Sequence, residues 1–204
     1  MRFTISIVTL SLLAILCQGC MTYSQSPQVI MPRVTRDPLF NSEVYSRIAV
    51  YVVDRTGSLR RSQGILRQVE DEFMRAIIEK GYKLATRSDI ELIAKEQDFQ
   101  ASNFSETVLA RKARALNVSA VLLVSINELS TVRYQPIAYV KGRRYYKTLA
   151  SVSARLIDAE RAQVVWLASH SGTYQVHDKR LEYKAIEPVS RIVARGLPFR
   201  HKSQ

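Results

Sequence analysis

Both cysteines of this 204-residue chain, Cys17 and Cys20, lie within its first 20 residues. One nearby pair cannot form a disulfide framework, and two thiolates cannot make a four-thiolate zinc site. The rest of the chain must therefore fold on a hydrophobic core alone. Hydrophobic residues make up 47% of the sequence and charged residues 24%, which is the balance of one ordinary globular domain.

An apolar run from Phe3 to Cys17 opens the chain. It is too short to span the ~30 Å hydrocarbon core of a bilayer but has the length of a signal-peptide core. Gly19, a small residue, then precedes Cys20, and this pattern resembles the bacterial lipobox. The resemblance implies that residues 1–19 are a removed signal peptide and that Cys20 carries fatty acyl chains such as palmitate. A plain secretory signal or an uncleaved anchor is the alternative.

Acylation at this position predicts where the protein works. Burial of acyl chains contributes ~0.8 kcal/mol per CH₂, so the three chains on Cys20 would hold the protein stably on a lipid bilayer. Met21 follows the cysteine, whereas Asp at that position retains lipoproteins of this kind at the inner membrane. We therefore expect anchoring at the cell outer membrane, on the periplasmic side. The net charge of +12 also suggests anionic surroundings, such as lipid head groups or peptidoglycan carboxylates.

The mature chain is expected to comprise a tether, one folded domain and a short basic end. Residues 20–44 are rich in proline and lack sustained periodicity, which predicts a flexible, extended tether. Residues 45–197 carry strand-like and helix-like segments in turn and form the domain. Residues 198–204 form a basic tail.

Hydrophobic periodicity places the elements of the domain. Apolar residues four apart from Ile65 to Ile77 predict an amphipathic helix that ends at Gly81. Ala120–Val124 is apolar on both faces, as in a central strand covered by helices. The other expected strands are 47–53, 82–86, 149–157 and 163–173, and the other helices are 88–97, 106–116 and 186–195. The result is an α/β fold, a single mixed-sheet sandwich with helices packed on the sheet, in the order β-α-β-α-α-β-β-β-α.

The sequence lacks motifs that would support catalysis. It contains no G-x-S-x-G elbow and no glycine-rich phosphate loop of the G-x-G-x-x-G or G-x-x-x-x-G-K-[ST] type. His170 and His177 lie on or just beyond one expected strand, and His201 lies in the tail, so the histidines are too scattered for a metal site. We therefore expect no enzymatic activity, no metal and no cofactor.

One segment interleaves cations with tyrosines around an expected turn at Lys141-Gly142. Apolar Val132 and Tyr134 alternate with polar neighbours, which predicts an amphipathic hairpin able to touch a membrane surface, a partner sheet or single-stranded nucleic acid. An exported, lipid-anchored protein rarely meets nucleic acid, so we expect no nucleic-acid partner. A solvated hairpin with no partner is the other interpretation. The candidate contact residues are Arg133, Tyr134, Tyr139, Arg143, Arg144, Tyr145 and Tyr146.

Several short segments of the domain occur in an order and spacing that a known family shares. They are Asp54-Arg55-Thr56-Gly57, 85–90 leading into 93–97, 115–122, Arg155-Leu156-Ile157-Asp158 followed by Val164-Val165, and Glu187-Pro188-Val189. Together with the lipobox they resemble the CsgG family of outer-membrane lipoproteins, which export curli subunits. The resemblance covers about residues 45–197. It implies non-enzymatic action in envelope assembly or export through contacts with an envelope protein, and a ring of identical copies.

Two departures separate the chain from a curli exporter, whose subunits each give two hairpins, with strands of ~9–11 residues, to a transmembrane pore. The first hairpin position, 131–148, carries Arg and Lys at mid-length, and the second, between Thr173 and Pro188, is too short for two crossing strands. We therefore expect no complete pore. The same fold occurs in the lipoprotein LpoB, which activates a peptidoglycan synthase. A regulator of such a synthase, or a peptidoglycan-associated adaptor, is the alternative function.

Overall fold

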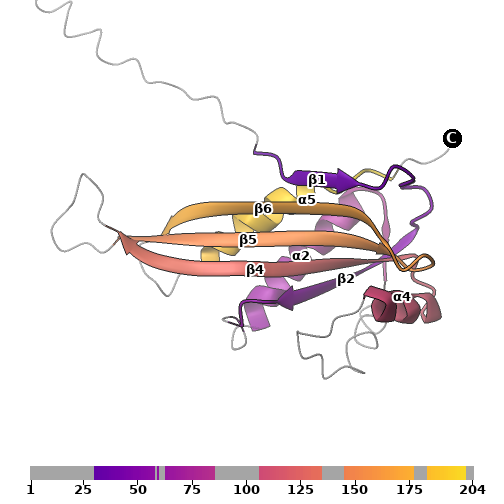
Figure 1. The fold of residues 1–204 in the computed structure, drawn as a ribbon, viewed down its shortest axis with the longest axis horizontal. Helices are drawn as coiled ribbons and strands as arrows, with labels where there is room; N and C mark the ends of the chain where they lie inside the picture. Colours follow the sequence, from indigo (N-terminus) through magenta and orange to yellow (C-terminus); the bar gives the residue numbers. More distant parts are fainter. Residues whose placement is uncertain are drawn as a thin grey trace, which may run out of the picture. The chain divides into compact units, whose positions relative to one another are not determined.

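The computed structural model describes residues 30–57, 59, 63–85, 106–134, 145–176 and 183–200. The chain divides into two units, Met1–Ile30 and Met31–Gln204, and all the elements below belong to the second. They form one six-stranded mixed sheet with helices on both of its faces (Figure 1). The expected α/β class, a single sheet covered by helices, is confirmed.

The order of the elements follows the expected order closely. The strands are β1 (Arg33–Arg36), β2 (Arg47–Asp54), β3 (Lys83–Leu84), β4 (Ala120–Tyr134), β5 (Tyr145–Asp158) and β6 (Val164–Val176), and the helices are α2 (Gln63–Glu79), α4 (Glu106–Ala115) and α5 (Ile186–Arg195). The sheet order is β1-β6-β5-β4-β2-β3. β2 runs parallel to β3 and β4, and the other neighbours are antiparallel. The helix expected at 88–97 lies outside the described residues.

One face of the sheet packs against α2 and α5. Phe73 and Ile77, four residues apart on α2, are both fully buried, as their spacing predicts. α5 contributes Val189 and Val193 to the same cluster, which includes Leu122 of β4. Each such side chain stabilises the fold by roughly 1.5–3 kcal/mol through removal of apolar surface from water. The two helices and this face of the sheet therefore form the main core.

The opposite face packs against α4. Leu109 of α4 is fully buried beside Val121 and Leu123 of β4, in a second and smaller cluster. The carboxylate of Glu106, at the start of α4, accepts a hydrogen bond of 2.9 Å from the guanidinium of Arg155 on β5. The first part of β4 is thus buried on both faces, as its continuous apolar run predicts.

β1 joins the edge of the sheet, where the sequence predicts only a tether. Arg33–Arg36 pairs antiparallel with Trp166–Ser169 of β6, and Asp37 N donates a hydrogen bond of 3.0 Å to the Val165 carbonyl. All four residues of β1 are exposed. The prediction of an unpacked segment over 20–44 is therefore wrong for this strand. Backbone pairing holds it, and such pairing leaves no hydrophobic pattern in the sequence.

The chain beyond α5 is also packed. Leu197 and Pro198 are buried, and Arg200 N donates a hydrogen bond of 2.9 Å to the Lys80 carbonyl at the end of α2. The expectation of a tail starting at Pro198 is wrong for residues 198–200, because this backbone contact and the two buried side chains hold them. Residues 201–204 lie outside the described residues.

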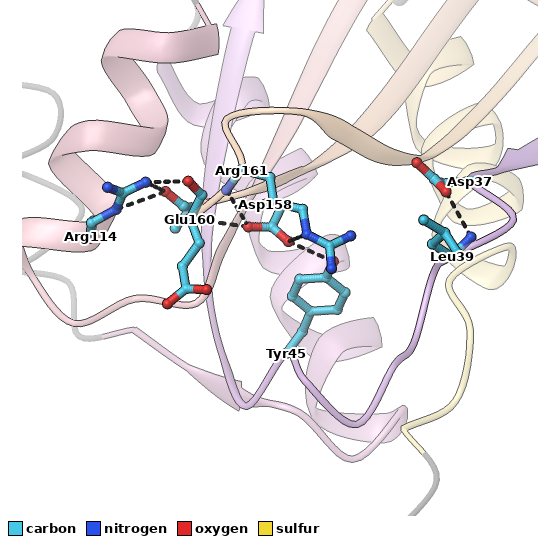
Figure 2. A network of polar contacts seen from close by, with 8 residues as sticks. Asp37, Leu39, Tyr45, Arg114, Asp158, Glu160 and Arg161 are labelled. Atoms are coloured by element: carbon cyan, nitrogen blue, oxygen red, sulfur yellow. Dashed lines mark hydrogen bonds and ion pairs between the residues drawn. The ribbon is translucent and has the colours of Figure 1, made fainter.

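A polar network fixes the turn between β5 and β6 (Figure 2). The Tyr45 hydroxyl donates a hydrogen bond of 2.9 Å to Asp158 Oδ2. Asp158 Oδ1 accepts from the backbone N–H groups of Glu160 and Arg161 at 2.7 and 2.9 Å. Arg114 of α4 donates to the Glu160 carbonyl. The turn therefore connects the segment before β2 with α4 and the sheet.

Candidate interaction surface on the sheet

Three strands continue past the end of β2 and form a three-stranded arm (Figure 1). The arm consists of 128–134 of β4, 145–151 of β5 and 171–176 of β6, which stay in register along its length. Pairing between β2 and β4 ends at Ile126, where Arg55 N donates a hydrogen bond of 3.0 Å to the Ile126 carbonyl. From that point the outer edge of β4 has no strand partner among the described residues.

A β-bulge at the base of the arm shifts the alternation of β4, so that odd-numbered residues beyond it lie on the face that even-numbered residues occupy before it. Ile126 pairs with Val152, but the next pair joins Glu128 to Ser151, so one residue is skipped. Beyond the bulge, Thr131 is on the face that packs against α2 and α5. Its hydroxyl oxygen lies 2.9 Å from that of Thr148, which is fully buried. The covered face of the arm therefore contains a hydroxyl pair.

The structure separates the predicted contact residues onto two faces. Arg133 is paired with Tyr146. Both lie on the face of the sheet that, closer to the base of the arm, packs against α2 and α5. Tyr134 occupies the adjacent position of β4, opposite Tyr145 in the register, and its side chain points to the opposite face. There the Lys147 ammonium lies 4.6 Å from the ring centre of Tyr134, within cation–π range. Lys147 is not among the predicted contact residues; the register places it opposite Val132, diagonally across from Tyr134 on the same face.

The predicted amphipathic pattern is only partly right. Val132 and Tyr134 do share a face, opposite Thr131 and Arg133. Val132, however, is 58% exposed, so the apolar side chain faces solvent and the hydroxyl of Thr131 faces the covered side. The bulge causes this difference, because it changes which residues of β4 face the helices.

The other predicted site residues lie outside the described residues. They are Cys20, Tyr139, Arg143 and Arg144. Acylation of Cys20 and a contact role for the other three therefore stay predictions. The side chain of Tyr145 is not described, and its strand position opposite Tyr134 is its only placement.

Both edges of the arm carry backbone groups that have no strand partner within the described ranges. β4 does not pair with β2 beyond Ile126, and β6 pairs with β1 only as far as Ser169. The two open edges lie on opposite sides of β5, because the sheet order is β6-β5-β4. Unpaired N–H and C=O groups on an edge strand favour pairing with a strand of another chain. Within the described ranges, both outer strands of the arm therefore have the open edge that such pairing needs.

The described residues show no arrangement typical of a metal site. No three of their His, Cys, Asp and Glu side chains come together in a group that could hold a metal ion. His170 is half-buried on β6, and His177 lies outside the described ranges. Over these same ranges, no helix is both long enough and apolar enough to cross a membrane.

Comparison with known proteins finds similarity only among solved structures. No protein-family model matches the chain, and no curated protein matches it. Lipoprotein GNA1162 from Neisseria meningitidis is 18% identical with a TM-score of 0.47, and the match covers 74% of this chain and 99% of that one. A PelC dodecamer from Paraburkholderia phytofirmans is 17% identical with a TM-score of 0.42, covering 80% and 96% of the two chains.

The C-terminal domain of LpoB from Escherichia coli is a further similar structure. It is 16% identical with a TM-score of 0.40, and the match covers 67% of this chain and 85% of that one. Because the three TM-scores are below 0.5, the function proposed below rests on the residues and contacts of this chain.

Proposed function

We propose that this chain is a lipid-anchored protein of the bacterial envelope that acts by contact with other macromolecules and not as an enzyme. The observation that carries the proposal is the three-stranded arm, whose two outer edges have no strand partner among the described residues, on a chain in which Gly19-Cys20 resembles a lipobox. A sheet edge binds another chain through main-chain hydrogen bonds, with side chains of the added strand giving specificity. This mode of binding needs no catalytic group.

The anchor is expected at Cys20, with the folded unit on the periplasmic side of the outer membrane. Met21 gives no inner-membrane retention signal, and the net charge of +12 suits a surface of anionic lipids. Cells that express the chain and receive labelled palmitate should label it, and Cys20→Ser should abolish the label. An unlabelled chain of full precursor mass in the cytosol would contradict the anchoring.

The partner that fits the arm best is a protein of the envelope, such as a peptidoglycan synthase that the chain regulates. The arm carries charges on both faces, with Arg133 on one and Lys147 on the other, so neither face suits burial in lipid. A pore-forming role is correspondingly disfavoured. An adaptor or regulator uses such a polar arm to reach an edge strand or loop of its target.

The regulator function is tested by placing a charge on the arm. Lys side chains on an edge strand oppose pairing with another strand. Val132→Lys should therefore weaken the effect of the protein on glycan polymerisation by its cognate synthase without unfolding the chain, because Val132 is already 58% exposed. Val44→Lys, at a site 63% exposed outside the arm, is the matched control. Polymerisation that is unaffected by the wild-type protein would exclude this function.

A second candidate function is assembly of identical copies, in support of envelope assembly or export. Two open edges on opposite sides of one arm favour it, because the β4 edge of one copy can pair with the β6 edge of the next and so close a ring. Light scattering of the full chain in detergent tests it. A strictly monomeric mass would exclude the ring, and a large assembly that Val132→Lys dissociates would support it.

A further inference from the structure

A basic pocket lies between β1, the end of α2 and the segment after α5. Its volume is about 550 Å³, and its charged lining residues are Arg36, Lys80 and Arg195. No Asp or Glu is among the described residues that line it. Phe40 and Phe199 add two aromatic rings to the walls. The cations come from three segments that are far apart in the sequence.

The three cations are available for a ligand. None of them forms an ion pair with any residue that the structure describes. The Lys80 ammonium lies 3.7 Å from the ring centre of Phe199, a contact that positions it without neutralising its charge. Two acids are next to these cations in sequence. Asp37, beside Arg36, accepts a 2.7 Å hydrogen bond from Leu39 N, and Glu79, beside Lys80, lines a neighbouring pocket and not this one.

Backbone contacts hold the walls of the basic pocket in place. β1, which carries Arg36, is hydrogen-bonded to β6 and packs closely on the end of α5. A Cβ on Gly196 would lie 2.8 Å from the Pro32 ring, so only glycine allows this approach. The hydrogen bond from Arg200 N to the Lys80 carbonyl fixes the other side. A ligand would therefore meet a largely preformed site and lose little free energy in ordering it.

Two helix ends at the basic pocket oppose anion binding to some extent. α2 and α5 both end there, and a helix C-terminus carries partial negative charge, which Lys80 and Arg195 offset. The exposed carbonyls are few, however, because those of Ala76 and Val193 already accept backbone hydrogen bonds. Arg36 belongs to a strand, so no helix C-terminus offsets its charge. The pocket therefore keeps a net positive charge.

We propose that the basic pocket binds a phosphate-bearing anion, either the headgroup of a membrane lipid or a soluble phosphate compound. Two guanidinium groups and an ammonium match the two charges and several acceptor oxygens of a phosphate monoester. Arg36 lies 16 residues after Cys20, which span at most about 55 Å when extended. The pocket can thus reach the membrane that holds the anchor. Binding of a lipid headgroup rests on the proposed anchoring at Cys20, whereas binding of a soluble phosphate does not.

Calorimetric titration of the full chain in detergent tests the proposal. The probes are pyrophosphate, dihexanoyl phosphatidic acid, and dihexanoyl phosphatidylcholine as the lipid without net charge. The pocket variant combines Arg36→Gln, Lys80→Gln and Arg195→Gln. The control variant combines Arg33→Gln, Arg67→Gln and Arg111→Gln, which removes the same charge from exposed positions outside the pocket. Thermal unfolding of both variants establishes that they stay folded.

We expect saturable binding of pyrophosphate or phosphatidic acid that the pocket variant weakens by at least about tenfold, while the control variant changes it little. Tighter binding of phosphatidic acid identifies the lipid source, and equal or tighter binding of pyrophosphate identifies the soluble source. Absence of saturable binding, or equal weakening by the two variants, would overturn the proposal. Palmitate labelling of Cys20 is independent of these results, so failure of the pocket and failure of the anchor are distinguishable.

Discussion

The Tyr45 hydroxyl donates a 2.9 Å hydrogen bond to the Asp158 carboxylate across 113 residues of sequence (Figure 2). Tyr45 is 3% exposed and Asp158 is 5% exposed, so neither group has ready access to water. A buried carboxylate is costly unless its oxygens are hydrogen-bonded. This contact therefore fixes the chain before β2 against the β5–β6 turn, and both segments depend on it.

Tyr45→Phe should destabilise the fold by about 1.5–3 kcal/mol, because it removes a hydrogen bond to a buried charged group. Urea unfolding measures the change. Tyr174→Phe is the control, because that hydroxyl makes no hydrogen bond with any residue that the structure describes. If Tyr45→Phe lowers the free energy of unfolding no more than Tyr174→Phe does, the Asp158 carboxylate does not need the hydrogen bond from Tyr45.

The protein should lose stability at alkaline pH. Burial raises the pKa of Tyr82 to about 12, and burial together with the hydrogen bond to Asp158 raises the pKa of Tyr45 as well. Above a pH of about 10 the unfolded chain releases these protons while the folded chain keeps them. The contribution of each tyrosine is thus complete below pH ~10 and decreases above it by ~1.4 kcal/mol per pH unit, for Tyr82 until pH ~12.

Unfolding free energies across this alkaline range provide the measurement. Tyr82→Phe should show a shallower decline than the wild type, because Phe has no proton to release. The comparison between the two proteins removes the effect of lysine titration, which they share. Parallel declines in both proteins would show that Tyr82 does not contribute.

Gly196→Ala should destabilise the fold by roughly 1–3 kcal/mol, the usual cost of overpacking. The added methyl would lie 2.8 Å from the Pro32 ring and 3.1 Å from the Val193 carbonyl. Gly64→Ala is the opposite case, because nothing lies within 4 Å of that position on α2, and it should be neutral or stabilising by up to ~1 kcal/mol. Thermal unfolding compares them, and equal melting temperatures would contradict close packing of β1 on α5.

The contributions of the Thr131 and Thr148 hydroxyls to the free energy of unfolding should be coupled, because the two oxygens lie 2.9 Å apart. Thr148→Val alone leaves the Thr131 hydroxyl without this partner and should cost about 1–2 kcal/mol. Replacement of both by Val should cost less than the sum of the single changes, because an apolar pair of the same shape leaves neither hydroxyl without the other. A double-mutant cycle from urea unfolding gives the coupling free energy, and a value near zero would mean that the pair is not coupled.

The core of the fold was predictable because burial leaves a pattern of apolar residues in the sequence of its elements. The spacing of Phe73 and Ile77 identified α2, and the run at the start of β4 identified the central strand. β1 was missed because its four exposed residues are held by backbone pairing and show no apolar period. The full length of β4 was missed because the bulge after Ile126 interrupts the alternation from which a strand is inferred.

The site residues were less predictable than the core. Register decides which side chains meet across strands, so the cation–π contact of Lys147 with Tyr134 could be found only in the structure. The basic pocket was missed because each of its segments supplies a single cation, and one Arg or Lys on the surface is not a signal. Only the fold brings Arg36, Lys80 and Arg195 to one cavity.

β1 lies between the predicted anchor and the remainder of the folded unit, and it is the edge strand of the sheet. With Cys20 held in the bilayer and the arm bound to a fixed partner, mechanical tension would reach the folded unit through β1 first. Four residue pairs with β6 would bear that load before any interior strand is strained. Detachment of β1 would lengthen the connection to the membrane and leave the core intact.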